Sequence, residues 1–440
     1  MSSFGSLRRR TVCLAAAFPL LGALAITAQQ AVLVRDLRPG IDRAASPNLY
    51  EAVGLGGRVV FGADDGVTGV ELWSTDGTAR GTQRIADLCP GPCSGTPTRF
   101  VVAGDQIFFY AVNSLGRTEL WRTDGTEDGT HVLPHPEIDG FGGSYPLQPF
   151  GVRSILFAAR TRRERWALWS SDGTVAGTRM IVDRNPGPEG STFERLRSFL
   201  GRLVLYDRGV GYDLVSDGTS LQPFIDVYPF LADFGLRGIE IGGKALVNRF
   251  TPPNHVEPWI TDGTAAGTVP LLGDLAEGLG FEASGDRLLF VRSEGDTQST
   301  YFSNGTPEGT QKIATGVVPS FEFNRVPFSQ AGARWVFSAV RLDDGARAIW
   351  ATDGTPEGTG PVLLPTDEVG LPNRAAPFAG RLLLAGRALW ITDGTPAGTE
   401  IVIEPDGFFG DAPLPVVAGD RAFYSRFDEE TGQELWALRP

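Results

Sequence analysis

The chain repeats one motif, of the form ELWxxDGTxxGT, along most of its length. Copies begin at Glu71, Glu119, Ala167, Glu257, Ala348 and Ala388. Two copies have diverged, YDLVSDGTS and TYFSNGTPEGT, and a truncated copy, ELWALRP, ends the chain. The residues at the tryptophan position are Trp73, Trp121, Trp169, Leu214, Trp259, Tyr301, Trp350, Trp390 and Trp436. Their spacing runs from 40 residues (350 to 390) to 49 (301 to 350), which is the length of one four-stranded propeller blade.

Each unit contains four short apolar runs separated by Gly, Asp or Pro. In the second unit these are RFVVAG, QIFFYAV, TELWRTD and THVLPH, rich in β-branched and aromatic residues. The pattern predicts an all-β chain, a β-propeller of four-stranded antiparallel blades. The tryptophan positions predict nine blades. Eight is the alternative, if one diverged unit is an insertion, and propellers usually have four to eight.

The final unit lacks a fourth strand. It contains PLPVVAG, DRAFYSRFD and ELWALRP, and then the chain ends. Residues 31–37, AVLVRDL, precede the first strand-one candidate and match the fourth-strand pattern TQRIADL. We therefore expect the N-terminal strand to complete the last blade, which would close the ring and hide its end edges.

The first 28 residues read as an export signal. Arg8–Arg10 form a basic segment, Val12–Ile26 an apolar one, and Ala25 and Ala28 end plausible cleavage sites. The apolar run is short for a membrane-spanning helix, so we expect no membrane span after signal removal. The predicted organisation is a signal peptide over 1–28 and a single propeller over 29–440, secreted or periplasmic, with Sec and twin-arginine export both open.

Two cysteines remain after signal removal. Cys89 and Cys93 flank Pro-Gly-Pro. In an oxidising compartment such a pair is a disulfide candidate. The alternatives are two free thiols or half of a metal site, and no second Cys or His pair completes such a site.

The repeated residues have structural interpretations. A tryptophan at one strand position of nearly every blade predicts packing between blades, with an N–H that can find a backbone acceptor. The acidic position of the DGT segment predicts a turn, because Asp and Asn accept a local backbone N–H and the next Gly tolerates positive φ. A calcium ion needs six to eight oxygen ligands, and the single carboxylate of each turn supplies too few of them. The turn residues are Asp76, Asp124, Asp172, Asp217, Asp262, Asn304, Asp353 and Asp393.

Charge and composition exclude some functions. The chain carries 39 basic and 52 acidic side chains, a formal charge of −13; without the three arginines of 1–28 it is 36 − 52 = −16. Such a surface repels phosphate backbones, so we expect no nucleic-acid partner. The three histidines, His131, His135 and His255, lack an HExxH context, and no GxSxG elbow or phosphate-binding loop occurs. The sequence therefore predicts no catalytic, metal or cofactor residues.

The motif resembles that of the ELWxxDGT repeat proteins, a family of bacterial exported propeller-like proteins. The resemblance extends over residues 31–440. Glu71-Leu72-Trp73 with Asp76-Gly77-Thr78 matches fully, as does the second unit. The fourth and sixth units lose tryptophan, and the fourth has Gln222-Pro223 where Gly-Thr is expected. The resemblance implies a propeller and no catalytic residues.

Residues Asp428–Trp436 also resemble the tryptophan-docking repeat of quinoprotein propellers and of a propeller lipoprotein that assists outer-membrane protein assembly. Quinoprotein enzymes have a disulfide of adjacent cysteines, whereas Cys89 and Cys93 are not adjacent. We expect no cofactor.

The connections that vary between repeat units are all expected on one face of the propeller. The segments from strand four to the next strand one, and from strand two to strand three, differ in length and content, and both should emerge opposite the DGT turns. ARTRRERWA, with Arg162, Arg163 and Arg165, is the candidate interaction segment. Variable loops on a rigid scaffold suit binding. We expect a monomeric, non-catalytic module binding a protein or polysaccharide of the envelope or exterior. The alternative is a secreted glycan hydrolase or lyase with carboxylates on that face.

Overall fold

The computed structural model describes residues 31–38, 48–133, 138–141, 147–161, 166–182, 193–207, 212–216, 221–231, 234–251, 255–272, 278–321, 325–364, 370–403, 415–428 and 432–439. Within them the strands form nine antiparallel sheets, one for each repeat unit. The chain is thus a nine-bladed β-propeller, as its nine tryptophan positions predict, and both diverged units form blades of their own.

The blades follow one another in sequence. The first three contain β2 (Asn48–Leu55), β3 (Arg58–Asp64), β4 (Val70–Thr75) and β5 (Gln83–Ala86); β6 (Thr98–Ala103), β7 (Gln106–Val112), β8 (Thr118–Thr123) and β9 (His131–Val132); and β10 (Ile138–Phe141), β11 (Gln148–Phe150), β12 (Ser154–Thr161), β13 (Ala167–Ser171) and β14 (Arg179–Val182). The next three contain β15 (Phe193–Phe199), β16 (Arg202–Asp207), β17 (Tyr212–Ser216) and β18 (Leu221–Pro223); β19 (Phe234–Ile241), β20 (Lys244–Thr251), β21 (His255–Thr261) and β22 (Val269–Pro270); and β23 (Gly278–Ser284), β24 (Arg287–Glu294), β25 (Thr297–Ser303) and β26 (Thr310–Thr315). The last three contain β27 (Val317–Pro319), β28 (Ser329–Ala331), β29 (Arg334–Arg341), β30 (Arg347–Thr352) and β31 (Gly360–Leu363); β32 (Arg374–Phe378), β33 (Arg381–Ala385), β34 (Leu389–Thr392) and β35 (Glu400–Ile403); and β36 (Val416–Ala418), β37 (Arg421–Asp428), β38 (Gly432–Leu438) and β1 (Ala31–Arg35).

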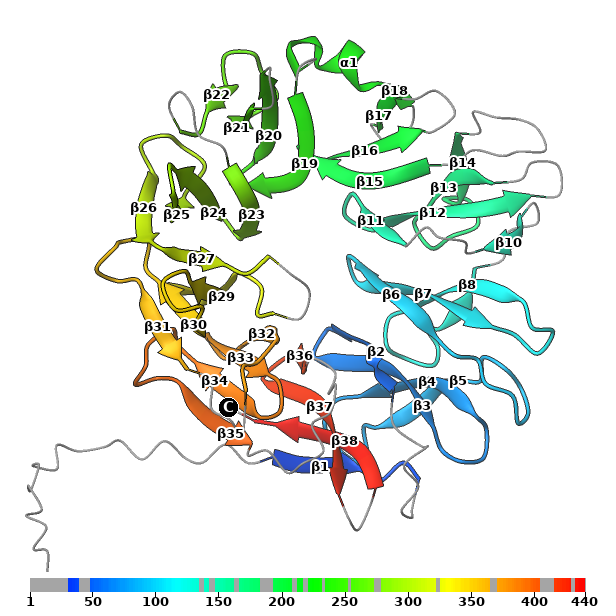
Figure 1. Ribbon diagram of the computed structural model, residues 1–440. Coiled ribbons are helices and arrows are strands. Elements are labelled where there is room, and N and C mark those ends of the chain that lie inside the picture. Colours follow the sequence, from blue (N-terminus) through cyan, green and yellow to red (C-terminus); the bar gives the residue numbers. More distant parts are fainter. Residues whose placement is uncertain are drawn as a thin grey trace, which may run out of the picture.

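Figure 1 shows the blades arranged around a common axis, with first strands such as β2, β6, β15 and β23 innermost. First strands of neighbouring blades touch, as β2 does β6 and β36. Blades 1 to 8 run outward in sequence order, and the third strand of each blade carries the tryptophan position.

The ninth blade is completed by the N-terminal strand. β1 lies antiparallel beside β38, with Leu33 opposite Trp436 and Arg35 opposite Leu435, so the two ends of the chain share one sheet (Figure 1). In blade 1 the corresponding partners are Arg84 opposite Trp73 and Ala86 opposite Leu72. Both pairings shift register beside the tryptophan. The N-terminal strand therefore occupies the same place as a regular fourth strand, and the ring is closed.

The core is divided among the nine interfaces between neighbouring blades. Each apolar cluster combines residues of two successive blades. Trp73 packs against Phe423 of blade 9, and Trp169 against Phe108 of blade 2. In the diverged units Leu214 and Tyr301 take the same place. Repetition thus replaces a single large core with nine smaller ones.

The backbone acceptor expected for the indole N–H is missing at three tryptophans, whereas Trp259 Nε1 donates to the Glu257 carboxylate at 3.2 Å. The indole nitrogens of Trp73, Trp121 and Trp436 are buried without a hydrogen-bond acceptor among the described residues. Arginine guanidinium groups lie over two of these rings instead, Arg35 6.0 Å from the Trp73 centroid and Arg426 5.1 Å from that of Trp436. These rings therefore stabilise the sheet through apolar packing and cation–π contact.

Three blades depart from the regular unit. In blades 3 and 7 the innermost strand is split into two segments, β10 with β11 and β27 with β28. In blade 4 the segment Gln222-Pro223 belongs to strand four itself, because Ser216 already pairs with Leu221. A short helix, α1 (Phe224–Val227), and a 3-10 turn, η1 (Pro229–Leu231), follow it and pack Phe224 on Phe199. None of the helices in the described ranges is long and apolar enough to cross a membrane.

Candidate binding face

The two faces of the ring are built differently. Because successive strands of each blade are antiparallel, the second strand starts and the third strand ends at the same end of the blade, which we call the DGT face. The second strand ends and the third strand starts at the opposite end, which we call the variable-loop face.

Each DGT turn that the structure describes satisfies its own polar groups. In blade 2, Asp124 Oδ1 accepts hydrogen bonds from the Thr126 backbone N–H at 2.9 Å and from the Thr126 hydroxyl at 2.6 Å. Thr126 Oγ1 in turn accepts the Gly129 N–H at 3.0 Å. Gly125 has φ 88°, and a Cβ on Gly129 would overlap the Asp124 carboxylate. The motif therefore needs both of its glycines.

The same bonds recur around the ring. The equivalent first residues of the described turns are Asp76, Asp172, Asp262, Asn304, Asp353 and Asp393. Asn304 accepts the same two bonds through its amide oxygen, at 3.0 and 2.8 Å. Asp217 lies outside the described residues. Hydrogen bonds from the threonine two residues on lower the pKa of Asp76, Asp262 and Asp353. This geometry is that of a turn former.

The DGT face also carries basic residues that the sequence analysis overlooked. Seven of the nine second strands in the described residues begin with Arg or Lys: Arg58, Arg202, Lys244, Arg287, Arg334, Arg381 and Arg421. Arg421 of blade 9 donates to the Asp76 carbonyl of blade 1, and Lys244 Nζ lies 3.4 Å from the Gly305 carbonyl of the next blade. In the sequence these basic residues recur directly after a turn that contains Gly, and this recurrence could have revealed them. Arg421 and Lys244 thus join neighbouring blades, whereas Arg334 and Arg381 bond to the Gly358 carbonyl and to Glu400 of their own blades.

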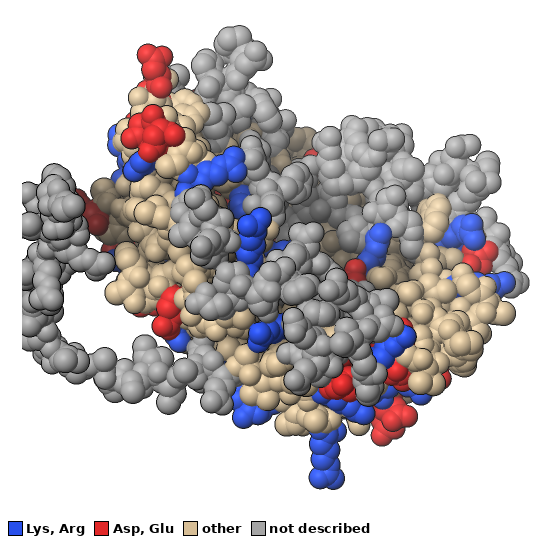
Figure 2. Space-filling view, turned by 60° about the horizontal axis from the view of Figure 1, so that its bottom comes forward, with Lys and Arg blue, Asp and Glu red and all other residues tan. Residues whose placement is uncertain are grey.

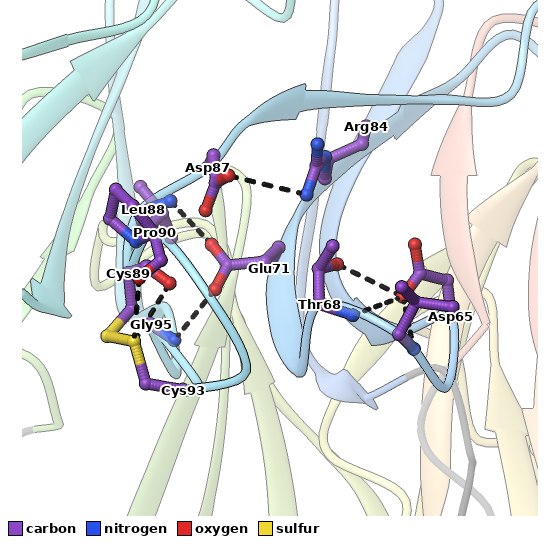
Figure 3. A network of polar contacts seen from close by, with 11 residues as sticks. Asp65, Thr68, Glu71, Arg84, Asp87, Leu88, Cys89, Pro90, Cys93 and Gly95 are labelled. Carbon is purple, nitrogen blue, oxygen red and sulfur yellow. Dashed lines mark hydrogen bonds and ion pairs between the residues drawn. A yellow bond between two sulfur atoms is a disulfide. The ribbon is translucent and has the colours of Figure 1, made fainter. Parts of the chain in front are cut away.

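On the variable-loop face, Glu71 fixes the loop that contains the two cysteines. This side chain is 0 % exposed, and its two oxygens accept the backbone N–H of Leu88 at 2.5 Å and of Gly95 at 3.1 Å (Figure 3). Cys89 and Cys93, which lie between those two residues, are joined by a disulfide with 5.6 Å between their Cα atoms. One carboxylate thus holds both ends of the cross-linked loop.

The neighbouring turn of blade 1 supports this loop. Asp65 Oδ1 accepts the backbone N–H groups of Val67 and Thr68 at 2.9 and 2.8 Å (Figure 3). The Val70 N–H donates to Ser94 Oγ at 3.0 Å. Two connections of this face are therefore packed together in a fixed arrangement.

Burial changes the proton affinity of Glu71 and of its counterpart in blade 9. Burial raises the pKa of Glu71 to about 7, and Asp87 adds to the rise, while the N–H donors of Leu88 and Gly95 lower it. Glu434 is 1 % exposed, and burial likewise raises its pKa to about 7, with Asp36 nearby. A raised carboxyl pKa is typical of a general acid, but Glu71 is enclosed and bonded to backbone.

The structure does not bring the predicted polar candidates into one site. Arg162, Arg163 and Arg165 lie outside the described residues, as does His135. His131 is exposed in β9 of blade 2, whereas His255 begins β21 of blade 5. No group of three or more His, Cys, Asp or Glu able to hold a metal ion occurs in the described part of the chain.

A pocket of about 370 Å³ opens between blades 7 and 8 on the variable-loop face. Its walls come from segments around Ser320, Arg347 and Leu371. Elsewhere the surface mixes charges: Figure 2 shows acidic and basic side chains interspersed among other residues on the visible face. The described surface on this face therefore does not indicate a partner that is selected by one sign of charge.

Comparison with known proteins shows weak similarity to propeller structures. No protein-family model and no curated protein matches the chain. A crystal structure of puromycin hydrolase is 16 % identical, with a TM-score of 0.36, over 79 % of this chain and 52 % of that one. The computationally designed Ika8 protein is 12 % identical, with a TM-score of 0.39, over 93 % and 99 % of the two chains. The β-propeller domain of the Trilobed protease from Pyrococcus furiosus is 13 % identical, with a TM-score of 0.34, over 72 % and 97 %. The chain thus spans about half of the puromycin hydrolase chain.

Proposed function

We propose that this protein is an extracytoplasmic, non-catalytic binding module of the ELWxxDGT repeat type, which contacts a protein or polysaccharide through its variable-loop face. The observation that carries the proposal is the contrast between the two faces. On the DGT face the same turn recurs, with its polar atoms used within the turn or by the next blade. The connections of the opposite face differ from blade to blade, and variable loops on a rigid frame are where binding sites usually lie.

Export is part of the proposal. The basic and apolar segments of residues 1–28 have the order of a signal peptide. The Cys89–Cys93 bond suits a secreted or periplasmic location, since disulfides persist in oxidising compartments.

A glycan hydrolase or lyase is the second candidate from the sequence. Such enzymes need two carboxyl groups facing one substrate site. Glu71 has the raised pKa of a general acid, but its two oxygens are bonded to backbone N–H groups and the side chain is 0 % exposed. The pocket between blades 7 and 8 has no carboxylate among its described lining residues. The burial of Glu71 and its two backbone hydrogen bonds favour a binding function over glycan hydrolysis.

The test is capture of a component from bacterial envelope extract by the exported protein, run beside a glycan-degradation screen. We expect a specific component to be retained and the glycans to remain intact. Time-dependent release of short or unsaturated products would instead support the enzyme. Failure to retain any envelope component would overturn the binding proposal.

A further inference from the structure

Blade 6 differs from the other described blades at the first position of its DGT turn. Asn304 lies where six other described turns have Asp, and its Oδ1 makes the same bonds. Of the eight asparagines in the chain, only Asn304 is followed by Gly. Because glycine has no Cβ to shield its backbone nitrogen, an Asn-Gly pair can lose ammonia through a cyclic imide. The turn of blade 6 therefore contains a pair of residues that can react with each other.

The amide oxygen of Asn304 receives two hydrogen bonds. The Thr306 backbone N–H donates to Oδ1 at 3.0 Å, and the Thr306 hydroxyl donates to it at 2.8 Å. The hydroxyl is held in place because Thr306 Oγ1 also accepts the Gly309 N–H at 3.0 Å. An attack on the amide carbon Cγ puts negative charge on Oδ1, and donors already placed at such an atom stabilise that charge. The two donors therefore lower the barrier to an attack on Asn304 Cγ.

The attacking atom is the backbone nitrogen of Gly305. Its N–H donates to Ser303 Oγ at 3.0 Å. Ser303 Oγ lies 2.7 Å from Thr310 Oγ1, which donates its own proton to the Thr306 carbonyl at 2.6 Å. The Ser303 proton therefore points to Thr310, and the lone pairs of Ser303 Oγ are left to accept the Gly305 N–H. An acceptor at this N–H raises the electron density on the nitrogen and favours loss of its proton.

The leaving group is accessible to water. Asn304 is exposed, and its Nδ2 has no hydrogen-bond partner among the described residues. Ammonia can therefore leave without breaking a contact of the turn, and water can reach the imide that remains.

We propose that Asn304 is a self-modification site, at which the folded chain converts its own amide into a carboxylate. The Gly305 nitrogen forms a bond to Asn304 Cγ and loses its proton to water, while the Cγ–Nδ2 bond breaks and Nδ2 leaves as ammonia. Water then adds to Cγ and breaks the new bond, and the Gly305 nitrogen regains a proton. The sum is an amide and water giving a carboxylate and ammonium, with no other reactant.

The product fits the turn of blade 6. Asp accepts the same two bonds at this position in the six other described turns, so the conversion completes the DGT motif. Lys244 Nζ of blade 5, 3.4 Å from the Gly305 carbonyl, supplies a cation beside the turn. If water opened the imide at the backbone carbonyl instead, the resulting isoaspartate would lengthen the main chain and break the turn. The folded chain therefore favours Asp over isoaspartate. The site lies on the DGT face, so this inference is independent of the proposed binding function.

The test follows the full mature chain in neutral buffer over several weeks, by peptide mass spectrometry and by release of ammonia. We expect Asn304 to become Asp, with isoaspartate in the minority. The chain unfolded in urea has no turn and should give mostly isoaspartate. Asn113 is the internal control: its Oδ1 accepts the Leu115 N–H at 2.9 Å, but Ser follows it in the sequence, so it should stay intact.

Three variants test the contribution of the turn. Asp124→Asn places Asn-Gly-Thr in blade 2, where the turn makes the same bonds, and should create a second site that reacts at a similar rate. Thr306→Val removes the hydroxyl donor and should slow the conversion about fivefold, the effect of one lost hydrogen bond. Thr306→Ser keeps the hydroxyl and should react as the wild type does.

Several outcomes would overturn the inference. They are an Asn304 that stays intact in the folded chain, a folded-chain product that is mostly isoaspartate, and equal rates in Thr306→Val and Thr306→Ser. A sugar attached to Asn304 Nδ2 in exported protein would also overturn it, since Asn304-Gly305-Thr306 has the pattern of a glycosylation acceptor as well. Capture from envelope extract is measured separately, so failure of this inference leaves the proposed function standing.

Discussion

Glu434 Oε2 accepts a hydrogen bond from the backbone N–H of Leu37 at 3.0 Å, although the two residues are 397 positions apart in sequence. Glu71 and Leu88 make the same contact in blade 1 within 17 positions. Both glutamates open the ELW motif, and both leucines follow a fourth strand. The bond at Glu434 therefore joins the two ends of the chain with an interaction that the repeat already uses.

The first prediction concerns pH. The pKa of Glu434 is raised from 4.5 to about 7 in the folded protein. Between these values the folded chain binds more protons than the unfolded chain, so the free energy of unfolding falls as pH rises through this window. The change is up to about 3 kcal/mol for such a shift. Glu434→Gln should flatten the decline, which urea unfolding at pH 5, 6, 7 and 8 would measure.

The matched control for this prediction is Glu119→Gln. Glu119 holds the same motif position but is half-buried and accepts the Asn113 side-chain amide at 2.9 Å. The decline should stay steeper in this variant than in Glu434→Gln, because the contact between Glu434 and Leu37 is intact. An unchanged slope in Glu434→Gln would show that the Glu434 carboxyl is not the titrating group.

The second prediction concerns the disulfide. We expect mass spectrometry of natively exported protein to show a two-hydrogen deficit on the peptide containing Cys89 and Cys93. Replacing both by Ser should cost only about 2 kcal/mol or less, since the closed loop is short and Glu71 still holds its ends. Free thiols in exported protein would refute the pairing.

The third prediction concerns the DGT turn. Asp124→Asn should be nearly silent, because Asn304 makes the same bonds in blade 6. Asp124→Ala should cost about 1 kcal/mol of stability. Gly129→Ala should cost more, since its Cβ would overlap the Asp124 carboxylate. Thermal melting of each variant measures these effects.

A double variant and a calcium titration provide the controls for this turn. Asp124→Ala combined with Gly129→Ala should be less destabilised than the sum of the two, because removing the carboxylate relieves the overlap. The turn role would be contradicted if Asn were as damaging as Ala and calcium raised the melting temperature of the wild type alone.

The fourth prediction concerns ring closure. Deleting residues 29–38 removes β1 and exposes the edge of β38, its partner. Exposed strand edges promote association, so the truncated protein should aggregate or lose its cooperative melt, as light scattering and calorimetry would show. A monomer with an unchanged melting temperature is incompatible with closure.

The sequence predicted those features of the fold that follow directly from its repeats. Nine tryptophan positions predicted nine blades, and the orphan strand at residues 31–37 predicted closure, because equivalent residues occupy equivalent places. The pocket could not be predicted in this way. Ser320, Arg347 and Leu371 come from segments of different length in each unit, so only the folded ring brings them together. The backbone acceptor expected for the indole N–H is absent at Trp73 because apolar packing fixes that ring.

The most direct test of the account is to block one face at a time. Leu342 on the variable-loop face is 49 % exposed, and Glu357 is exposed in the DGT turn of the same blade. Each is replaced singly by Cys, coupled to a bulky maleimide polymer, and assayed for capture from envelope extract. We predict that the polymer at Leu342→Cys abolishes capture and that the polymer at Glu357→Cys leaves it intact. Loss of capture with the block at 357 but not at 342 would contradict binding through the variable-loop face.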